Sequence, residues 1–412
     1  MDAQDNRDVR VVAAFDGAPV GEASPSGSRK DLLKVTDQDA TFSLRCSRGF
    51  TALDVVSGRL VVKAQCGDRE KALRFTAHDL TVLKKAALKE LNADVTPALW
   101  SPADLDAVKA RVKTGSMTPV LLPAGLPSPD GSAIIGLRGH LFLTGGSNSL
   151  LSQYQAPVDD AVLSRVDRWV DLFAQRQEQC EARGLRYLQT VLPEKLTALR
   201  ADALLQIDGP SRLLQELESR LRGTDFYVSG LEPFDQWSSE DDPFLMADTH
   251  LSAAGAQSVF AALAARIDPQ LVPLIEAIRM DEVRYATGDL SGRFGLPIYS
   301  RIVEPSEDQV SAYRGGLEMV EKHFPPENGS IGRRFRWVND TAPSALKVLV
   351  FGNSFFSIGD FAGSLSWWGK HFFREFHFQW APDVDWALVD ELRPDIVVGQ
   401  TVERFLGRIP EA

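Results

Sequence analysis

The sequence predicts an α/β protein, in which a largely parallel β-sheet packs against helices and follows a small β-rich module. Short apolar runs, such as Leu185–Leu192 and Leu346–Phe351, end at Pro or Gly, as buried parallel strands often do. Stretches with helical spacing of apolar residues lie between these runs. The first 78 residues differ, because they hold only short strand-like runs separated by Gly, Ser and Asp.

Length and composition limit the classes of protein that are possible. A chain of 412 residues is too long for one ordinary core and predicts two or three structural units. Its hydrophobic content of 44% and charged content of 25% are typical of a soluble globular protein. The net charge of −11 argues against a surface that binds nucleic acid or an anionic membrane, since phosphate binding needs a basic footprint.

The cysteines and the N-terminus predict the cellular compartment. Cys46, Cys66 and Cys180 show no metal-ligand spacing and are expected to be reduced thiols, although a Cys46–Cys66 bridge stays open. We see no signal peptide at the N-terminus, and no apolar run approaches the roughly 18 residues that span a bilayer. As the sequence stands we expect a cytoplasmic protein without a membrane span, or a periplasmic one if a leader has been removed.

Three parts are expected along the chain. Residues 1–78 form the β-rich module, with strand candidates at Val9–Phe15, Ala40–Leu44, Gly58–Ala64 and Ala72–Thr76. Residues 79–133 combine a helical segment with a linker rich in proline, which blocks helices and central strands. Residues 134–412 form the α/β part.

Periodicity places several elements in the α/β part. One buried helical stripe is expected at Val162, Val166, Trp169, Val170 and Phe173. The other expected elements are strands at Leu185–Leu192, Phe226–Val228 and Asp395–Val398, and helices at Ser211–Arg222, behind the N-cap Ser252, and after Ser354 with Phe361, Leu365, Trp368 and Phe372 on one face. Residues 270–345 show no clear pattern.

Two short motifs carry the possible chemistry. Ser354 follows the apolar run and Gly352, so it is expected at the rim of the sheet, where ligands bind in open α/β folds. A serine needs an adjacent base, and His250 is the best candidate because the ordinary pKa of a histidine side chain lies near neutral pH. Asp248 lies two residues before His250 and can orient the imidazole, as the acid of a serine triad does.

The same residues also allow plainer interpretations. Gly-x-Ser after a strand is usually a turn, and Asp-x-His is usually a capped loop. The oxyanion donor is expected to be the backbone N–H of Ser354, while Asn353 either donates from its side chain or shapes the turn. A metal site would need a third ligand, and His323, His371 and His377 have no supporting pattern, so neither a metal nor a cofactor is expected.

The order of the motifs resembles the SGNH-hydrolase-like domain of the alginate O-acetyltransferases AlgX and AlgJ. Asp248-Thr249-His250 precedes Gly352-Asn353-Ser354-Phe355 by about a hundred residues, whereas ordinary SGNH esterases place the serine block first. Further matching stretches are Gly139–Leu143, Gly184–Leu192 with Pro193-Glu194-Lys195, Pro394–Val398, and Glu403-Arg404-Phe405-Leu406. The resemblance covers roughly residues 134–408.

This resemblance implies a fold and an activity. The fold would be a three-layer α/β/α SGNH-like domain, and the activity transfer or hydrolysis of acetyl esters on carbohydrate hydroxyls. Ser354 would be the nucleophile, His250 the base and Asp248 its orienter. Asn353, Lys195 and Arg404 would bind the oxyanion or the substrate. The implied partners are a carbohydrate or polysaccharide and an acetyl donor.

Two departures from the family pattern support an alternative function. Asn353 stands where the family usually has Asp, and Leu251 replaces the usual Trp after the histidine, on what would be the substrate face. The alternative is a catalytically weak or inactive protein that binds glycans or acts as a scaffold in polysaccharide biosynthesis.

Overall fold

The computed structural model describes most of the chain beyond its first quarter. The described residues are 9–25, 42–50, 52–56, 59–73, 82–83, 86, 124–146, 149–235, 237–239, 241–294, 298–326 and 329–410. The chain divides into two compact units, Met1–Leu121 and Leu122–Ala412. The helical segment and linker expected at residues 79–133 lie mostly outside the described residues.

The first unit contains a four-stranded antiparallel sheet with the order β2-β1-β3-β4. Its elements are β1 (Arg10–Phe15), β2 (Ala18–Ala23), α1 (Ala52–Val56), β3 (Leu60–Cys66) and β4 (Arg69–Ala72). A hairpin joins β1 to β2 through Asp16-Gly17, which is a common turn pair because both residues tolerate positive φ. The N-terminal module is therefore β-rich, as the sequence predicts.

The central sheet of the second unit is mostly parallel. Its order is β11-β12-β14-β13-β15-β7-β8, and the pairs from β14 to β8 are parallel, while β11 and β12 are antiparallel additions at one edge. The strands are β7 (Arg186–Leu192), β8 (Tyr227–Ser229), β11 (Leu317–His323), β12 (Arg334–Asn339), β13 (Ser344–Gly352), β14 (Phe373–Trp380) and β15 (Ile396–Val402).

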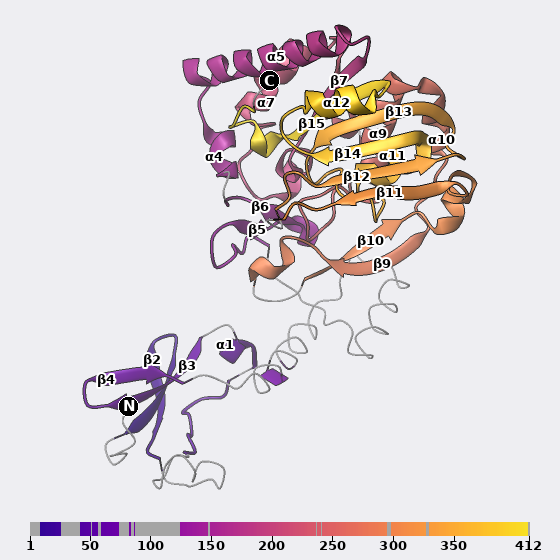
Figure 1. The fold of residues 1–412 in the computed structure, drawn as a ribbon. Coiled ribbons are helices and arrows are strands. Elements are labelled where there is room, and N and C mark those ends of the chain that lie inside the picture. The colour runs from indigo at the N-terminus through magenta and orange to yellow at the C-terminus, as the bar shows by residue number, and fades with distance from the viewer. Residues whose placement is uncertain are drawn as a thin grey trace. The chain divides into compact units, whose positions relative to one another are not determined.

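Helices cover both faces of this sheet (Figure 1). One face packs against α9 (Ala253–Ile267), α10 (Val272–Glu276) and α11 (Leu365–Phe372). The other packs against α5 (Asp160–Glu181), α7 (Arg212–Leu221) and α12 (Trp386–Leu392). The result is the predicted three-layer α/β/α arrangement.

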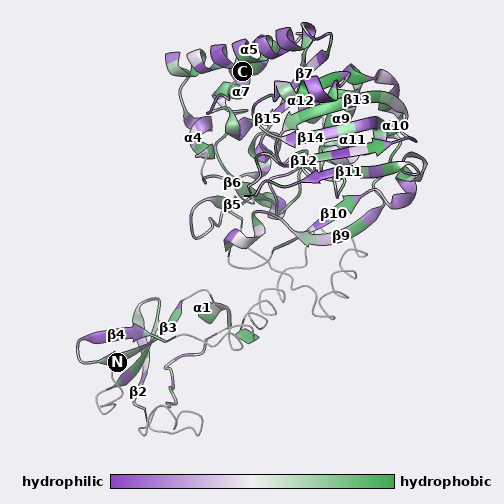
Figure 2. Ribbon diagram, in the orientation of Figure 1, coloured by the Kyte–Doolittle hydropathy of each residue, from purple (hydrophilic) through white to green (hydrophobic). Residues whose placement is uncertain are grey.

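Strand β13 explains the continuous apolar run that the sequence shows before Gly352. Val348 and Val350 join the core beneath α9 and α11, whereas Leu349 and Phe351 join the core beneath α12. Alternate side chains of a strand point to opposite faces, so a strand buried on both faces must be apolar throughout. Figure 2 shows the hydrophobic residues concentrated in the central strands, while hydrophilic and hydrophobic residues alternate along α5.

Shorter elements complete the second unit. They are β5 (Ala133–Ile135), β6 (Leu141–Leu143), α4 (Leu150–Gln155), α6 (Lys195–Ala198), α8 (Glu232–Asp235), β9 (Glu282–Thr287) and β10 (Tyr299–Glu304). The hairpins β5–β6 and β9–β10 are separate two-stranded sheets. Among the described residues, no helix is both long enough and apolar enough to cross a membrane.

Candidate active site

Ser354 lies in the turn that leaves the carboxyl end of β13. Strands β14 and β15 flank β13 in parallel, so this turn is at the carboxyl rim of the sheet. The turn is fixed from both sides: Asn353 N donates to Gln400 Oε1 at 3.0 Å, and Phe355 and Phe356 are buried in the core. Ser354 itself is partly exposed, because its neighbours anchor the chain around it.

His250 and Asp248 lie on the loop that enters α9. Ser252 caps this helix, with its Oγ accepting a hydrogen bond from Gly255 N, as the sequence predicts. Leu251 is fully buried in the core beneath α9, so it does not form the substrate face expected from its replacement of Trp. The preceding residue, His250, is partly exposed.

The structure brings Ser354, His250 and Asp248 together. His250 Nε2 lies 2.7 Å from Ser354 Oγ, and His250 Nδ1 lies 2.6 Å from Asp248 Oδ1. Each of the two imidazole nitrogens therefore has one partner in hydrogen-bond reach. This geometry allows the imidazole to accept the serine proton while a carboxylate fixes its tautomer.

Hydrogen bonds hold Asp248 as a carboxylate. Oδ1 also accepts from His250 N at 2.9 Å, and Oδ2 accepts from Asp289 N at 2.9 Å. Burial acts to raise the pKa of Asp248, but the hydrogen bond and charge of His250 with the two backbone donors outweigh it and hold this pKa well below its ordinary value. Asp248 can therefore stay ionised beside a protonated imidazole.

Lys195 is placed differently from its expected role in binding the oxyanion or substrate. Its side chain is only 2% exposed, and Nζ lies within 3.2 Å of four backbone carbonyl oxygens, from Leu141, Leu245, Met246 and Asp248. Burial lowers the pKa of Lys195 to about 7, against the charge of Asp248 and other carboxylates. In this position Lys195 supports the loop that carries Asp248, because buried carbonyls need donors.

Arg404 and Asn353 both line a pocket at the rim of the sheet. Arg404 Nε lies 2.6 Å from Oε1 of the buried Glu194. Burial raises the pKa of Glu194, and the charge of Arg404 opposes this. The Oδ1 of Asn353 accepts from Phe355 N at 3.2 Å, which matches the expectation that Asn353 shapes the turn. An aspartate could accept this bond equally, so the departure from the family pattern leaves the turn intact.

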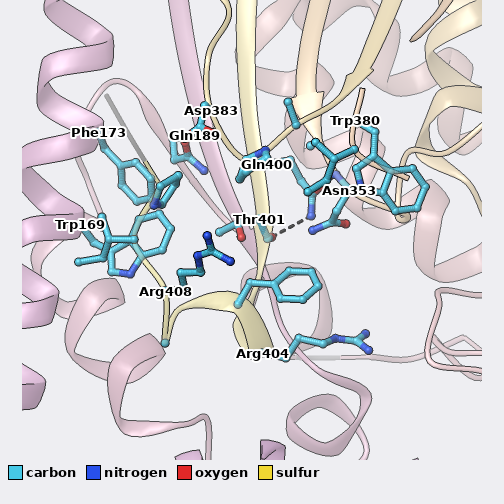
Figure 3. Close-up of a pocket in the computed structure, with 18 of the residues that line it drawn as sticks. Trp169, Phe173, Gln189, Asn353, Trp380, Asp383, Gln400, Thr401, Arg404 and Arg408 are labelled. Carbon is cyan, nitrogen blue, oxygen red and sulfur yellow. Dashed lines mark hydrogen bonds between the residues drawn. The ribbon is translucent and has the colours of Figure 1, made fainter. Parts of the chain in front are cut away.

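A pocket of about 690 Å³ adjoins Asn353 (Figure 3), and Ser354, His250 and Asp248 are not among the residues that line it. Its wall includes Asn353, the residue directly before Ser354, and extends to the ends of β13 and β15. The lining also includes aromatic rings, a hydroxyl and guanidinium groups, among them Trp380, Phe405, Thr401, Arg404 and Arg408. Figure 3 shows the guanidinium of Arg408 pointing into this space. The pocket therefore offers both flat apolar surfaces and polar groups.

A residue that sequence reasoning missed lies next to the triad. Asp289 Oδ2 is 3.7 Å from His250 Nδ1, and the Asp289 carboxylate accepts from both the N–H and the hydroxyl of Thr249. Asp248, His250 and Asp289 also place one possible metal-ligand atom each within 4.8 Å of one another. A metal bound there would take the Nδ1 atom that Asp248 uses. The only sequence signal was Gly288-Asp289 after a strand, in the stretch without a clear pattern.

The fold and the site define an SGNH-type α/β domain, and a family comparison agrees. Residues 142–320 match the model of the SGNH hydrolase-like domain of the acetyltransferase AlgX. The second unit thus contains an AlgX-like SGNH domain, as the resemblance implies. The matched stretch includes Asp248 and His250 and ends before Ser354, so the place of Ser354 beside them comes from the structure.

Several solved structures are similar to this chain at low sequence identity. The O-acetyltransferase domain of Pseudomonas putida AlgJ is 15% identical, with 68% of this chain and 94% of that one covered and a TM-score of 0.44. Bacillus cereus PatB1 with a sulfonyl adduct is 12% identical, covering 60% and 89%, at 0.41. Pseudomonas aeruginosa AlgX is 12% identical, covering 66% and 62%, at 0.39. A comparison with curated proteins gave no match.

Proposed function

We propose that this protein is a carbohydrate O-acetyltransferase or acetylesterase that works through an acetyl-Ser354 intermediate. The observation that carries the proposal is the 2.7 Å separation of His250 Nε2 and Ser354 Oγ, with Asp248 on the other imidazole nitrogen. The AlgX-type domain supports acyl transfer as the class of reaction. The glycan-binding alternative would have been favoured by a serine and a histidine far apart.

The reaction begins with the attack of Ser354 on an acetyl ester. His250 Nε2 takes the hydroxyl proton while Oγ bonds to the acetyl carbonyl carbon, and Asp248 stabilises the imidazolium that forms. The carbonyl oxygen becomes an oxyanion. The backbone N–H of Ser354 is the proposed donor to it, since this N–H has no hydrogen-bond partner within the part of the chain that the structure describes.

The second half of the reaction returns the enzyme to its first state. Collapse of the tetrahedral intermediate breaks the ester bond, and the imidazolium gives its proton to the leaving alkoxide. A sugar hydroxyl or a water molecule then attacks acetyl-Ser354 while His250 accepts its proton, and Ser354 Oγ leaves with that proton. Transferase and esterase differ only in which acceptor attacks.

The pocket that Asn353 lines supports a carbohydrate as the substrate. Trp380 and Phe405 provide flat apolar surfaces, and Thr401, Arg404 and Arg408 provide polar groups around them. Such a mixture suits a ligand with apolar ring faces and many hydroxyls. Because Asn353 belongs to this wall, a sugar in the pocket would lie next to the turn that carries Ser354.

The test is acetyl turnover with p-nitrophenyl acetate as donor, with and without soluble oligosaccharides. We expect turnover by the wild type and a loss of about 10⁴-fold or more in Ser354→Ala, the range seen when a triad serine is removed. Ser357→Ala is the matched control, since Ser357 is the other hydroxyl in the same turn and should be dispensable. Full turnover by Ser354→Ala would contradict the proposal, and oligosaccharide binding without any turnover in the wild type would favour the glycan-binding function.

A further inference from the structure

Asp289 makes an unusual number of contacts with the loop that carries Asp248 and His250. It lies in the turn after β9, and its Oδ1 accepts from Thr249 N at 2.8 Å, while its Oδ2 accepts from Thr249 Oγ1 at 2.5 Å. Its own backbone N–H donates to Asp248 Oδ2 at 2.9 Å. One residue therefore binds two of the three residues of the Asp248-Thr249-His250 loop.

We propose that Asp289 is a positioning residue that holds the Asp248-Thr249-His250 loop and places a second carboxylate beside the His250 imidazole. The 3.7 Å between Asp289 Oδ2 and His250 Nδ1 is too long for a hydrogen bond but short for two charges. The inference rests on the proposed function, because it concerns the base of that reaction. Asp248 orients the imidazole ring, and Asp289 fixes the Asp248-Thr249-His250 loop.

The turn that carries Asp289 fits closely against this loop. A Cβ on Gly288 would lie 2.1 Å from Ala247 O and 2.6 Å from Asp248 Cβ, so only glycine allows this approach. Leu290 follows, with its side chain buried and its N–H donating to Ala247 O at 3.2 Å. Asp289 is thus held in register between two fixed neighbours, and its carboxylate position is set by the fold.

The charges around Asp289 determine what it does to the imidazole. Asp248 and His250 face it from the loop before α9, and the buried Lys195 faces the same cluster from α6. Arg293, in the short helical turn that follows, pairs with Asp130 instead. Desolvation by the surrounding loop and the charge of Asp248 raise the pKa of Asp289 above its ordinary value, although 41% of its side chain is exposed, while His250 and Thr249 act against this rise. Protonation of the imidazole relieves the repulsion between the two carboxylates.

Removal of the Asp289 charge should change the pH dependence of the rate, which a purely structural role of Asp289 would not. Two carboxylates stabilise the imidazolium more than one does, so the neutral variant Asp289→Asn should hold the imidazolium less well. A general base must be unprotonated, and its protonation sets the acid limb of the kcat/KM profile. We therefore expect Asp289→Asn to move that limb to lower pH by about 1 pH unit, with a lower plateau rate.

The experiment compares the wild type with four variants over a full pH–rate profile. Asp289→Asn is isosteric and keeps an oxygen for Thr249, and Asp289→Ser is a smaller neutral variant for use if the first unfolds. Asp289→Glu keeps the charge, and we expect its acid limb at the wild-type pH even where its plateau rate is lower. Asp281→Asn is the matched control, because Asp281 binds Ser306 and Gln309 just before the same hairpin and makes no contact with the triad.

A second readout does not depend on activity. The imidazole of His250, identified by loss of its NMR signal in His250→Gln, should take up its proton at lower pH in Asp289→Asn than in the wild type. An unchanged titration, or a plateau loss without movement of the acid limb, would overturn the inference. If the wild type has no acyl-transfer activity, the proposed function fails, while the NMR titration still decides whether Asp289 acts on His250.

Discussion

The two segments that carry the proposed Ser354-His250-Asp248 triad are held in place in different ways. Ser354 is positioned by the sheet, since β13 lies between two parallel strands and two phenylalanines anchor the turn after it. Asp248 and His250 lie on a loop with no strand neighbours at their own positions. Side chains from distant parts of the sequence hold this loop, namely Lys195 from beneath and Asp289 from the side.

Substitutions in the two segments should therefore damage activity and stability to different degrees. A strand end held by backbone pairing tolerates changes in single side chains. A loop held by a few buried polar contacts does not, because each lost contact leaves a buried group without a partner. The base loop is therefore expected to be the more sensitive of the two segments.

Replacement of Lys195 by methionine should have the largest effect on this comparison. Four carbonyl oxygens would lose their shared donor, which we expect to cost about 3 kcal/mol in the free energy of unfolding. Displacement of Asp248 by a fraction of an ångström to 1 Å should lower kcat/KM about 10²-fold. Urea unfolding and steady-state kinetics measure the two effects. A variant with wild-type stability and rate would show that the loop does not depend on Lys195.

The pH dependence of stability gives a second test of Lys195. Its pKa is about 7 in the folded protein, against the ordinary 10.5, so between these values the unfolded chain binds a proton that the folded protein does not. Stability must then rise with pH in this window. Relative to Lys195→Met, the wild type should gain about 2 kcal/mol between pH 7 and pH 9. A flat difference between the two unfolding curves would contradict a pKa near 7 for the buried amine of Lys195.

Gly288→Ala should have a smaller effect confined to the base loop. The added methyl would meet Ala247 O at 2.1 Å, so the turn that carries Asp289 must move away from Asp248. We expect a fall of about 10- to 100-fold in kcat/KM and a loss of about 1–2 kcal/mol in stability. Gly292→Ala is the matched control, since a Cβ there meets no atom within 4 Å. Equal rates in the two variants would argue against tight docking of this turn.

Asn353→Asp should have the smallest effect, because it changes the serine turn. The carboxylate oxygen can still accept from Phe355 N, so the turn should keep its shape. We expect kcat/KM within about tenfold of the wild type. A fall of about 10² to 10³-fold would instead identify the Asn353 amide as an oxyanion donor, since that is the usual cost of removing one. Steady-state kinetics with p-nitrophenyl acetate separates these outcomes.

The comparison also explains what could be predicted from the sequence. The serine turn was predictable because a strand buried on both faces has a continuous apolar run. The Asp248-Thr249-His250 motif was predictable because its three residues are adjacent in the sequence. Asp289 was not, since it lies 41 residues after Asp248 and meets it only through the fold. Lys195 was predicted to bind the oxyanion or the substrate. A sequence does not distinguish a lysine that lines a pocket from a buried lysine that supports a loop.

The strands show the same limit. β14 was missed because its run of aromatic residues directly follows α11, and Phe361 lies outside that helix although the sequence places it on the helical face. β2 was missed because it contains Pro19 and Gly21, which are rare within strands. Phe42–Leu44, the described part of the expected strand Ala40–Leu44, is not a strand. In each case the presence or absence of pairing with neighbouring strands decides the structure, against the preference of the local sequence.

In the proposed mechanism, His250 activates Ser354 as an acyl acceptor. The most direct measurement is peptide mass spectrometry after brief reaction with p-nitrophenyl acetate and acid quenching, in the wild type and in His250→Ala. We expect one acetyl group on the peptide that contains Ser354 in the wild type and at least about 10³-fold slower labelling in His250→Ala. Equal labelling of both proteins, or an acetyl group on another residue during turnover, would contradict it.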